Sequence, residues 1–141
     1  MSRSIVGTWR LSSFTEKDLV TGAVRYPMGE RAAAMVIYTA DGYTATLFTA
    51  EGRHAPAGAQ VTDSEAAQLY RSLIAFAGRY ELDGDKLVYR PEITWNEAWN
   101  GTLQVRFFTI EDDLLRVDSA PIASPSSGNQ IVFSLVWERA I

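Results

Sequence analysis

Charged side chains recur at alternating positions in two short segments, the spacing of side chains on one face of a β-strand. Arg90 and Glu92 share one face of the first segment, and Gln104 and Arg106 share one face of the second. Residues 93 to 102 can form the connection of a hairpin that brings opposite charges together. Inside a cavity, such a pair would orient a ligand carbonyl or enolate. Arg90, Glu92 and Arg106 are therefore candidate catalytic residues.

The opposite phase of the same two strands gives a different interpretation. The alternate positions hold the more apolar set and would face the core: Leu87, Tyr89, Ile93, Leu103, Val105 and Phe107. The charged set would then form a salt-bridge ladder on the exterior. Alternation alone does not choose the phase of a half-polar strand, so both interpretations stand.

Aromatic side chains are the second group that can recognise a ligand. Trp95 and Trp99 lie in the polar loop 94 to 101, where a rim that closes over an apolar ligand, or a dimer contact, would use them. Tyr89 is also a catalytic candidate, because a tyrosine can polarise a carbonyl. The full set of ligand-binding candidates is Tyr38, Tyr43, Tyr80, Tyr89, Trp95, Trp99, Gln104 and Arg106.

A third group joins the two ends of the sequence. In a closed barrel the first and last strands are neighbours, so Trp9 can meet Trp137 or lie under the guanidinium of Arg139. These three residues predict a structural plug at one end. A ligand would then enter at the other end, where loops 50 to 60 and 94 to 101 gather.

The same residues carry a family resemblance. Gly7-x-Trp9 and the late Arg139 resemble the lipocalin signature. Five further stretches, in order, resemble the small bacterial and fungal lipocalin-like domain family: Tyr26–Gly29, Tyr38–Tyr43, Gly78–Asp85, Trp99–Phe107 and Leu135–Arg139. The resemblance implies a β-barrel with a ligand cavity, and it implies no reaction, because fold and chemistry are separable.

Composition narrows the chemistry and the partners. The chain has no cysteine and one histidine, His54, in a glycine-containing loop where a solvated side chain is the ordinary outcome. No hydrolase, phosphate-loop or zinc-protease motif occurs, and we expect neither a metal nor a cofactor. A net charge of -4 provides no basic excess, so nucleic acid and membrane surfaces are not expected partners.

Short runs with a period of two predict antiparallel strands that would position these residues. We place them at about 5–14, 22–27, 34–40, 43–49, 76–82, 86–93, 102–110, 113–118 and 130–139. Asp41-Gly42 and Asp83-Gly84 predict tight hairpin turns. One segment, 63 to 75, has helical spacing with Thr62 or Asp63 as its N-cap, and it would lie against or cap the barrel.

Residues 1–141 are thus expected to form a single all-β domain, an antiparallel up-and-down barrel of about eight or nine strands with one helix. Its expected function is to bind a small hydrophobic molecule, aromatic or polyene-like, without a cofactor. The alternative is a cofactor-free cyclase or isomerase of natural-product biosynthesis, for example one that folds a polyketide chain for cycloaddition. The segment at 1 to 10 lacks an apolar signal, which favours a cytoplasmic location, and a homodimer is a further expectation.

Overall fold

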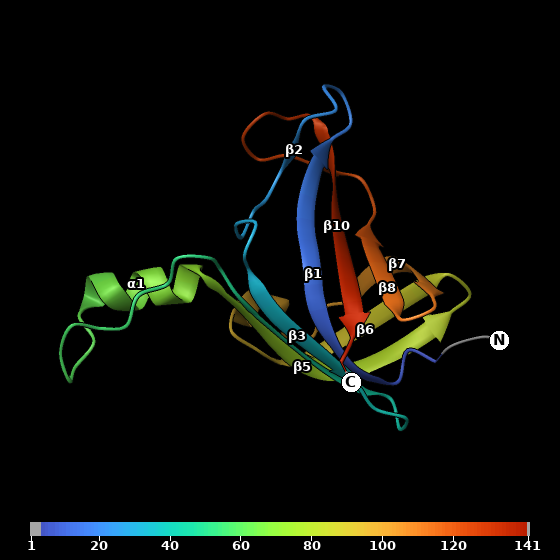
Figure 1. The fold of residues 1–141 in the computed structure, drawn as a ribbon, viewed down its shortest axis with the longest axis horizontal. Helices are drawn as coiled ribbons and strands as arrows, with labels where there is room; N and C mark the ends of the chain where they lie inside the picture. The colour runs from blue at the N-terminus through green and yellow to red at the C-terminus, as the bar shows by residue number, and fades with distance from the viewer. Residues whose placement is uncertain (1–3, 141) are drawn as a thin grey trace.

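Eight antiparallel strands close into a barrel in the computed structural model, which describes residues 4–140 (Figure 1). The barrel strands are β1 (Gly7–Asp18), β3 (Ala33–Tyr38), β4 (Tyr43–Thr49), β5 (Leu73–Asp83), β6 (Lys86–Thr94), β7 (Gln104–Glu111), β8 (Leu114–Ser119) and β10 (Gln130–Arg139). The first and last, β1 and β10, pair from Trp9 with Arg139 to Asp18 with Ile131 and close the sheet. The predicted all-β antiparallel barrel is confirmed. Of the segment at 1 to 10, residues 1–3 lie outside the described residues.

Alternation decides which side chains fill the barrel. In β4, Thr44, Thr46 and Phe48 are buried, whereas Ala45 and Leu47 between them are exposed. Such strict alternation is the pattern of a strand with one face on the core and one in water. The same pattern in the neighbouring strands directs one continuous set of side chains inward.

The connections differ in length between the two ends of the barrel. At one end, which we call the closed end, β3–β4, β5–β6 and β7–β8 are joined by turns at 39–42, 84–85 and 112–113. Gly42 has a φ of 94° in the first of these, a conformation that favours glycine. At the other end, the open end, the connections are long: 19–32, 50–72, 95–103 and 120–129. The short strands β2 (Val24–Arg25) and β9 (Ile122–Ala123) pair there with β1 and β10, respectively.

The helix α1 (Asp63–Arg71) begins where it was predicted and ends earlier. Thr62 caps it through a capping box with Glu65. The predicted end at residue 75 is wrong, because Leu73 and Ile74 pair with Thr49 and Phe48 of β4 as the start of β5. Burying these apolar side chains in the sheet outweighs their helical spacing.

The expected position of the helix is also wrong. Figure 1 shows α1 beside the barrel, beyond the ends of β4 and β5, and none of its residues is buried. It packs instead on its own loop: Arg53 Nε donates to Ser72 Oγ at 3.0 Å, and Ala57 N donates to Glu65 Oε2 at 2.9 Å. Residues 51–72 therefore form an arm, a name used below for this segment. Within residues 4–140 no helix is long and apolar enough to cross a membrane.

Candidate functional site

A cavity of about 240 Å³ occupies the half of the barrel toward the open end. Seven of its lining residues are aromatic: Phe14, Phe48, Phe76, Tyr89, Trp99, Phe133 and Trp137. Three are aliphatic and two are polar: Ile74, Val117, Leu135, Thr46 and Arg106. An apolar wall with a few placed polar groups is the ordinary composition of a small-molecule site.

The other half of the barrel is filled by side chains. The largest fully buried residues are Trp9, Val36, Tyr38, Leu87 and Leu115, all close to the closed end in the strand register. This packing confines any ligand to the half that holds the cavity.

Trp9 and Arg139 seal the closed end. The guanidinium carbon of Arg139 lies 4.1 Å from the centroid of the Trp9 ring, and Trp9 Nε1 donates to the carbonyl oxygen of Ile5 at 2.8 Å. Arg139 also donates to the carbonyl oxygens of Ser4 and Val6. Trp137 was also predicted to belong to the plug, and this prediction is wrong. It pairs with Leu11, two residues further from the closed end than Trp9, and lines the cavity. Its ring packs edge-on against Phe48 at 5.4 Å.

The loop 95–103 brings Trp99 to the cavity. Its short helix η1 (Glu97–Trp99) is capped by the Asn96 side chain, which accepts from Ala98 N. The Trp99 ring lies 5.6 Å from Phe76 in the cavity wall and 5.1 Å from Trp95. Trp95 therefore supports Trp99 from outside the set of lining residues.

Arg106 is the charged group of the cavity wall. Its Nη1 donates to the carbonyl oxygen of Val105 at 3.0 Å, and its Nη2 donates to Gln104 Oε1 at 3.3 Å. Gln104 Nε2 donates to Thr102 Oγ1, which donates to the carbonyl oxygen of Trp99 at 2.6 Å. Burial lowers the pKa of Arg106, with the nearby Tyr89 opposing this effect, and a guanidinium remains charged at neutral pH.

Two buried tyrosines lie between the cavity and the closed end. Tyr38 Oη and Tyr89 Oη are 2.5 Å apart, and Tyr89 reaches the cavity wall. Burial raises the pKa of Tyr38 well above its ordinary value and that of Tyr89 to about 12. Both hydroxyls are therefore neutral at physiological pH, and each can donate a hydrogen bond.

The predicted charged residues of β6 and β7 face different sides of the barrel wall. In β6 the apolar phase is observed at Leu87 and Tyr89, which face inward, while Arg90 and Glu92 are exposed. Arg90 Nε bonds Glu81 Oε1 at 2.9 Å on the exterior. Ile93 was predicted to face inward and is 74% exposed, because the register of β6 against β5 shifts between Pro91 and Ile93. In β7 the opposite phase is observed: Arg106 lines the cavity, and Leu103 is 54% exposed. Arg90 and Glu92 therefore do not join Arg106 in a cavity patch.

The tyrosine candidates are also divided. Tyr80 packs edge-on against Tyr38 at 5.0 Å and donates to the carbonyl oxygen of Thr39, near the closed end. Tyr43 is exposed under Arg79, whose guanidinium carbon is 4.9 Å from the ring centroid. His54 lies in the arm beside Arg53 and Glu65, and no described residue of loop 50–60 lines the cavity.

Sequence reasoning did not include several of the cavity residues: Phe14, Thr46, Phe48, Ile74, Phe76, Val117, Phe133 and Leu135. Leu135 and Phe133 share the inward phase of Trp137, which the sequence had already singled out. Extending the phase of Trp137 along its strand would have found Leu135 and Phe133.

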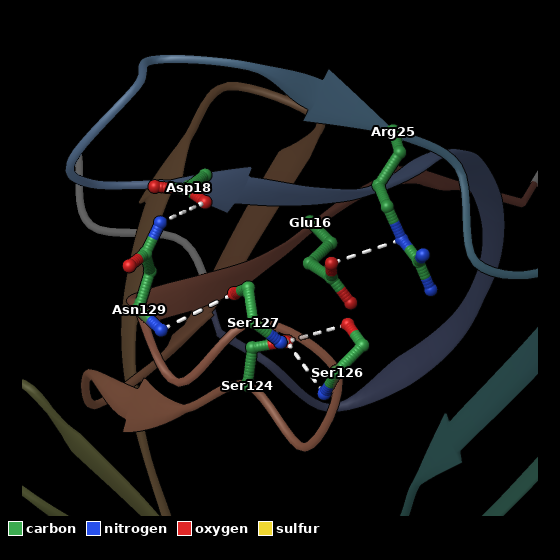
Figure 2. A network of polar contacts seen from close by, with 7 residues as sticks. All are labelled: Glu16, Asp18, Arg25, Ser124, Ser126, Ser127 and Asn129. Atoms are coloured by element: carbon green, nitrogen blue, oxygen red, sulfur yellow. Dashed lines mark hydrogen bonds and ion pairs between the residues drawn. The ribbon is translucent and has the colours of Figure 1, made fainter.

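Polar side chains tie the long connections of the open end to β1. Figure 2 shows Arg25 of β2 paired with Glu16 of β1 at 2.9 Å. It also shows the Asn129 side chain donating to Asp18, the Asn129 backbone donating to Ser127, and Ser126 bonded to Ser124 in the loop before β10. The bonds from Asn129, Thr21 and Val20 lower the pKa of Asp18. These contacts order the rim on the side of the barrel where β1 and β10 meet.

The chain was compared with protein families and with curated proteins. A family model described as a lipocalin-like domain matches residues 6–140. No curated protein matches the chain. Within residues 4–140, no group of three or more His, Asp or Glu side chains is arranged to hold a metal ion.

Proposed function

Because the chain belongs to the lipocalin-like domain family, whose barrel suits small hydrophobic ligands in general, we propose that it binds one small, aromatic hydrophobic molecule in the cavity described above. The observation that carries the proposal is an unfilled space of about 240 Å³ with a mostly aromatic wall. Filling such a space with an apolar molecule removes its surface from water without any rearrangement of the barrel.

The size of the cavity favours a compact ligand over a long polyene. At about 30 Å³ for each molecule of liquid water, the space equals about eight waters. A molecule with one or two aromatic rings fits that space. Rings from Phe76, Trp99 and Phe133 would pack against such a ligand in tilted or edge-on geometry.

Native mass spectrometry and quenching of tryptophan fluorescence, with a panel of one- and two-ring aromatic compounds, test the proposal. Leu135→Trp places a larger ring in the cavity and should abolish binding. Leu114→Trp is the matched control, because Leu114 is 47% exposed on the adjacent strand β8. If no compound binds the unmodified protein, or if both variants bind equally well, the proposal is wrong.

The cofactor-free cyclase or isomerase remains an alternative prediction. Among the described residues that line the cavity, the ionisable groups are Tyr89 and Arg106, so a reaction there would rely on shape and on hydrogen bonds to a substrate oxygen. Chromatography of the compound recovered from the protein distinguishes the two. An unchanged compound supports binding alone, and a rearranged isomer supports the enzyme.

The homodimer and the cytoplasmic location also remain proposals. Apolar side chains on the outer face, including Leu47 and Ile93, are the ones that a second copy would cover. Sedimentation equilibrium of the unmodified protein and of Leu47→Lys tests the homodimer, which requires a mass that falls to that of one chain in the variant.

A further inference from the structure

Arg106 has no acidic partner among residues 4–140. The ion pairs of the described residues join Arg25 to Glu16, Arg90 to Glu81 and Arg139 to Asp113, and none of them involves Arg106. Its two protein acceptors are a carbonyl oxygen and a carboxamide oxygen, both neutral. A guanidinium has five N–H donors, so Arg106 has donors left for another group.

The surroundings of Arg106 make an unpaired charge costly. It lines a cavity whose other walls are almost all hydrocarbon or aromatic rings, and burial lowers its pKa. Arg106 is half-buried, and charges withdrawn from water in proteins are ordinarily paired, because less water remains to solvate them. An anion that arrives with the ligand would supply the missing partner.

Thr46 provides a second, independent observation. Its hydroxyl oxygen is buried, lines the same cavity from β4, and has no hydrogen-bond partner among residues 4–140. A buried hydroxyl without a partner is disfavoured, so a ligand oxygen at this position would be stabilised. The cavity thus holds two polar groups with unused capacity, and one of them is cationic.

We propose that the ligand is a small hydrophobic acid whose carboxylate, or an equivalent oxyanion, binds Arg106 while its ring body packs on the aromatic wall. This inference rests on the proposed function and adds the charge of the ligand to it. The planar guanidinium matches a carboxylate in a two-point hydrogen-bonded fork, which a neutral carbonyl or amide cannot reproduce. The hydroxyl of Thr46 is the second contact for a ligand oxygen.

Two probes of nearly equal shape test the charge preference. Naphthalene-2-carboxylate and naphthalene-2-carboxamide have the same ring system and differ in charge. Isothermal titration calorimetry should show the acid binding about 10- to 100-fold more tightly than the amide, as expected for hydrogen bonds between charged groups. Arg106→Met should remove this preference, so that the acid and the amide bind this variant with affinities within about threefold of each other.

Matched variants separate a local effect from a general one. Arg116→Met removes the same charge from the exposed face of the neighbouring strand β8 and should leave the preference unchanged. Arg106→Lys retains a cation without the planar fork and should keep part of the preference. Binding of the amide by Arg106→Met shows that the variant is folded with its cavity intact, and circular dichroism of Arg106→Lys provides a second check.

The failures of the two proposals can be told apart. If the unmodified protein binds acid and amide equally, or if Arg106→Met retains the preference, Arg106 does not select an acid, and the binding function is unaffected. If neutral compounds of the panel bind the unmodified protein and neither naphthalene probe does, the inference is wrong and the proposed function stands. If no compound of the panel binds, both fail.

Discussion

The hydroxyl pair of Tyr38 and Tyr89 links burial to an expected dependence of stability on pH. Burial raises the pKa of Tyr38 well above its ordinary value and that of Tyr89 to about 12, whereas an unfolded tyrosine ionises near pH 10. Above about pH 10 the unfolded chain therefore holds fewer protons than the folded protein. The free energy of unfolding should fall as the pH rises to about 12, by up to about 1.4 kcal/mol per pH unit for each tyrosine.

Urea unfolding across this alkaline range measures the effect. The variant with Tyr38→Phe and Tyr89→Phe has no such protons to lose, so its stability should decline less steeply. At neutral pH the same variant lacks one buried hydrogen bond, which is worth about 1 kcal/mol. Parallel declines in the two proteins would show that other groups cause the alkaline loss.

Trp99 is expected to contribute more to binding than to stability. Its ring is half-buried at the cavity and held by contacts to Phe76 and Trp95. Trp99→Ala should weaken binding of naphthalene-2-carboxylate by about 1 to 3 kcal/mol, with little change in the free energy of unfolding. Trp95→Ala removes an equal ring outside the lining set and should weaken binding less. A Trp99→Ala protein that binds normally and unfolds more easily would place Trp99 in the core.

At the scale of single residues, the sequence indicated which strands carry the candidate residues better than it indicated which side chains face the cavity. The apolar-in rule correctly orients Leu87 and Tyr89 in β6 and fails in β7, where Arg106 faces the cavity while Val105 and Phe107 take the other face. The reason is physical: the pairing of β7 with β6 and β8 places Arg106 opposite the buried Leu87 and turns it toward the cavity. The residue types along one strand do not show how that strand pairs with its neighbours.

The pairing of β5 with β6 depends on one glycine. The register shifts between Ala77 and Gly78, and a Cβ at position 78 would meet the backbone oxygen of Arg90 and lie 2.9 Å from the backbone nitrogen of Glu92. Gly78→Ala should therefore lower the free energy of unfolding by about 1 to 3 kcal/mol, as other overpacked sites do. Gly58→Ala in the arm, where a Cβ meets nothing, is the control in the same urea titration. Equal midpoints for the two variants would show that the sheet tolerates the side chain.

The arm is expected to be dispensable for the barrel. Ala50 N donates to the carbonyl oxygen of Ser72 at 2.9 Å, so the ends of β4 and β5 are already neighbours where the arm departs. Replacing residues 51–71 with a tight Asn-Gly turn should leave the barrel folded and binding of naphthalene-2-carboxylate unchanged. Circular dichroism and calorimetry measure both. A loss of binding with retained fold would instead assign a ligand-contacting role to the arm, His54 included.

Element boundaries were predictable where local chemistry decides them. Thr62, one of the two predicted N-caps, starts α1 and is completed by Glu65 in a capping box. The end of α1 was not predictable from spacing, because Leu73 and Ile74 fit the apolar face of a helix and the inner face of a strand equally well. Pairing with β4, a contact between segments far apart in the chain, resolves that choice.

The whole molecule is closed by the pairing of its first and last strands, which predicts tolerance to circular permutation. Arg139 Nη2 donates to the carbonyl oxygen of Ser4 at 2.7 Å, so the two ends of the described chain are adjacent. A permutant that joins the original ends through a short glycine linker and opens the chain at Gly58 should fold and bind the acid probe as the parent does. Thermal unfolding of both proteins tests this. A permutant that cannot fold would show that order of synthesis, and not only the closed sheet, determines the barrel.

The difference between the closed end and the open end of the barrel bears on how fast a ligand enters and leaves, as well as on its affinity. With Trp9 and Arg139 sealing one end, a bound molecule leaves by the gap through which it entered, past the loop that carries Trp99. That loop is held by bonds such as Thr102 Oγ1 to the carbonyl of Trp99 and Gly101 N to the carbonyl of Pro91. For the proposed ligand, we expect the breaking of these bonds to control the residence time and contacts with the cavity wall to control the affinity. Uptake and release can therefore be slowed or hastened at the rim without altering the interior.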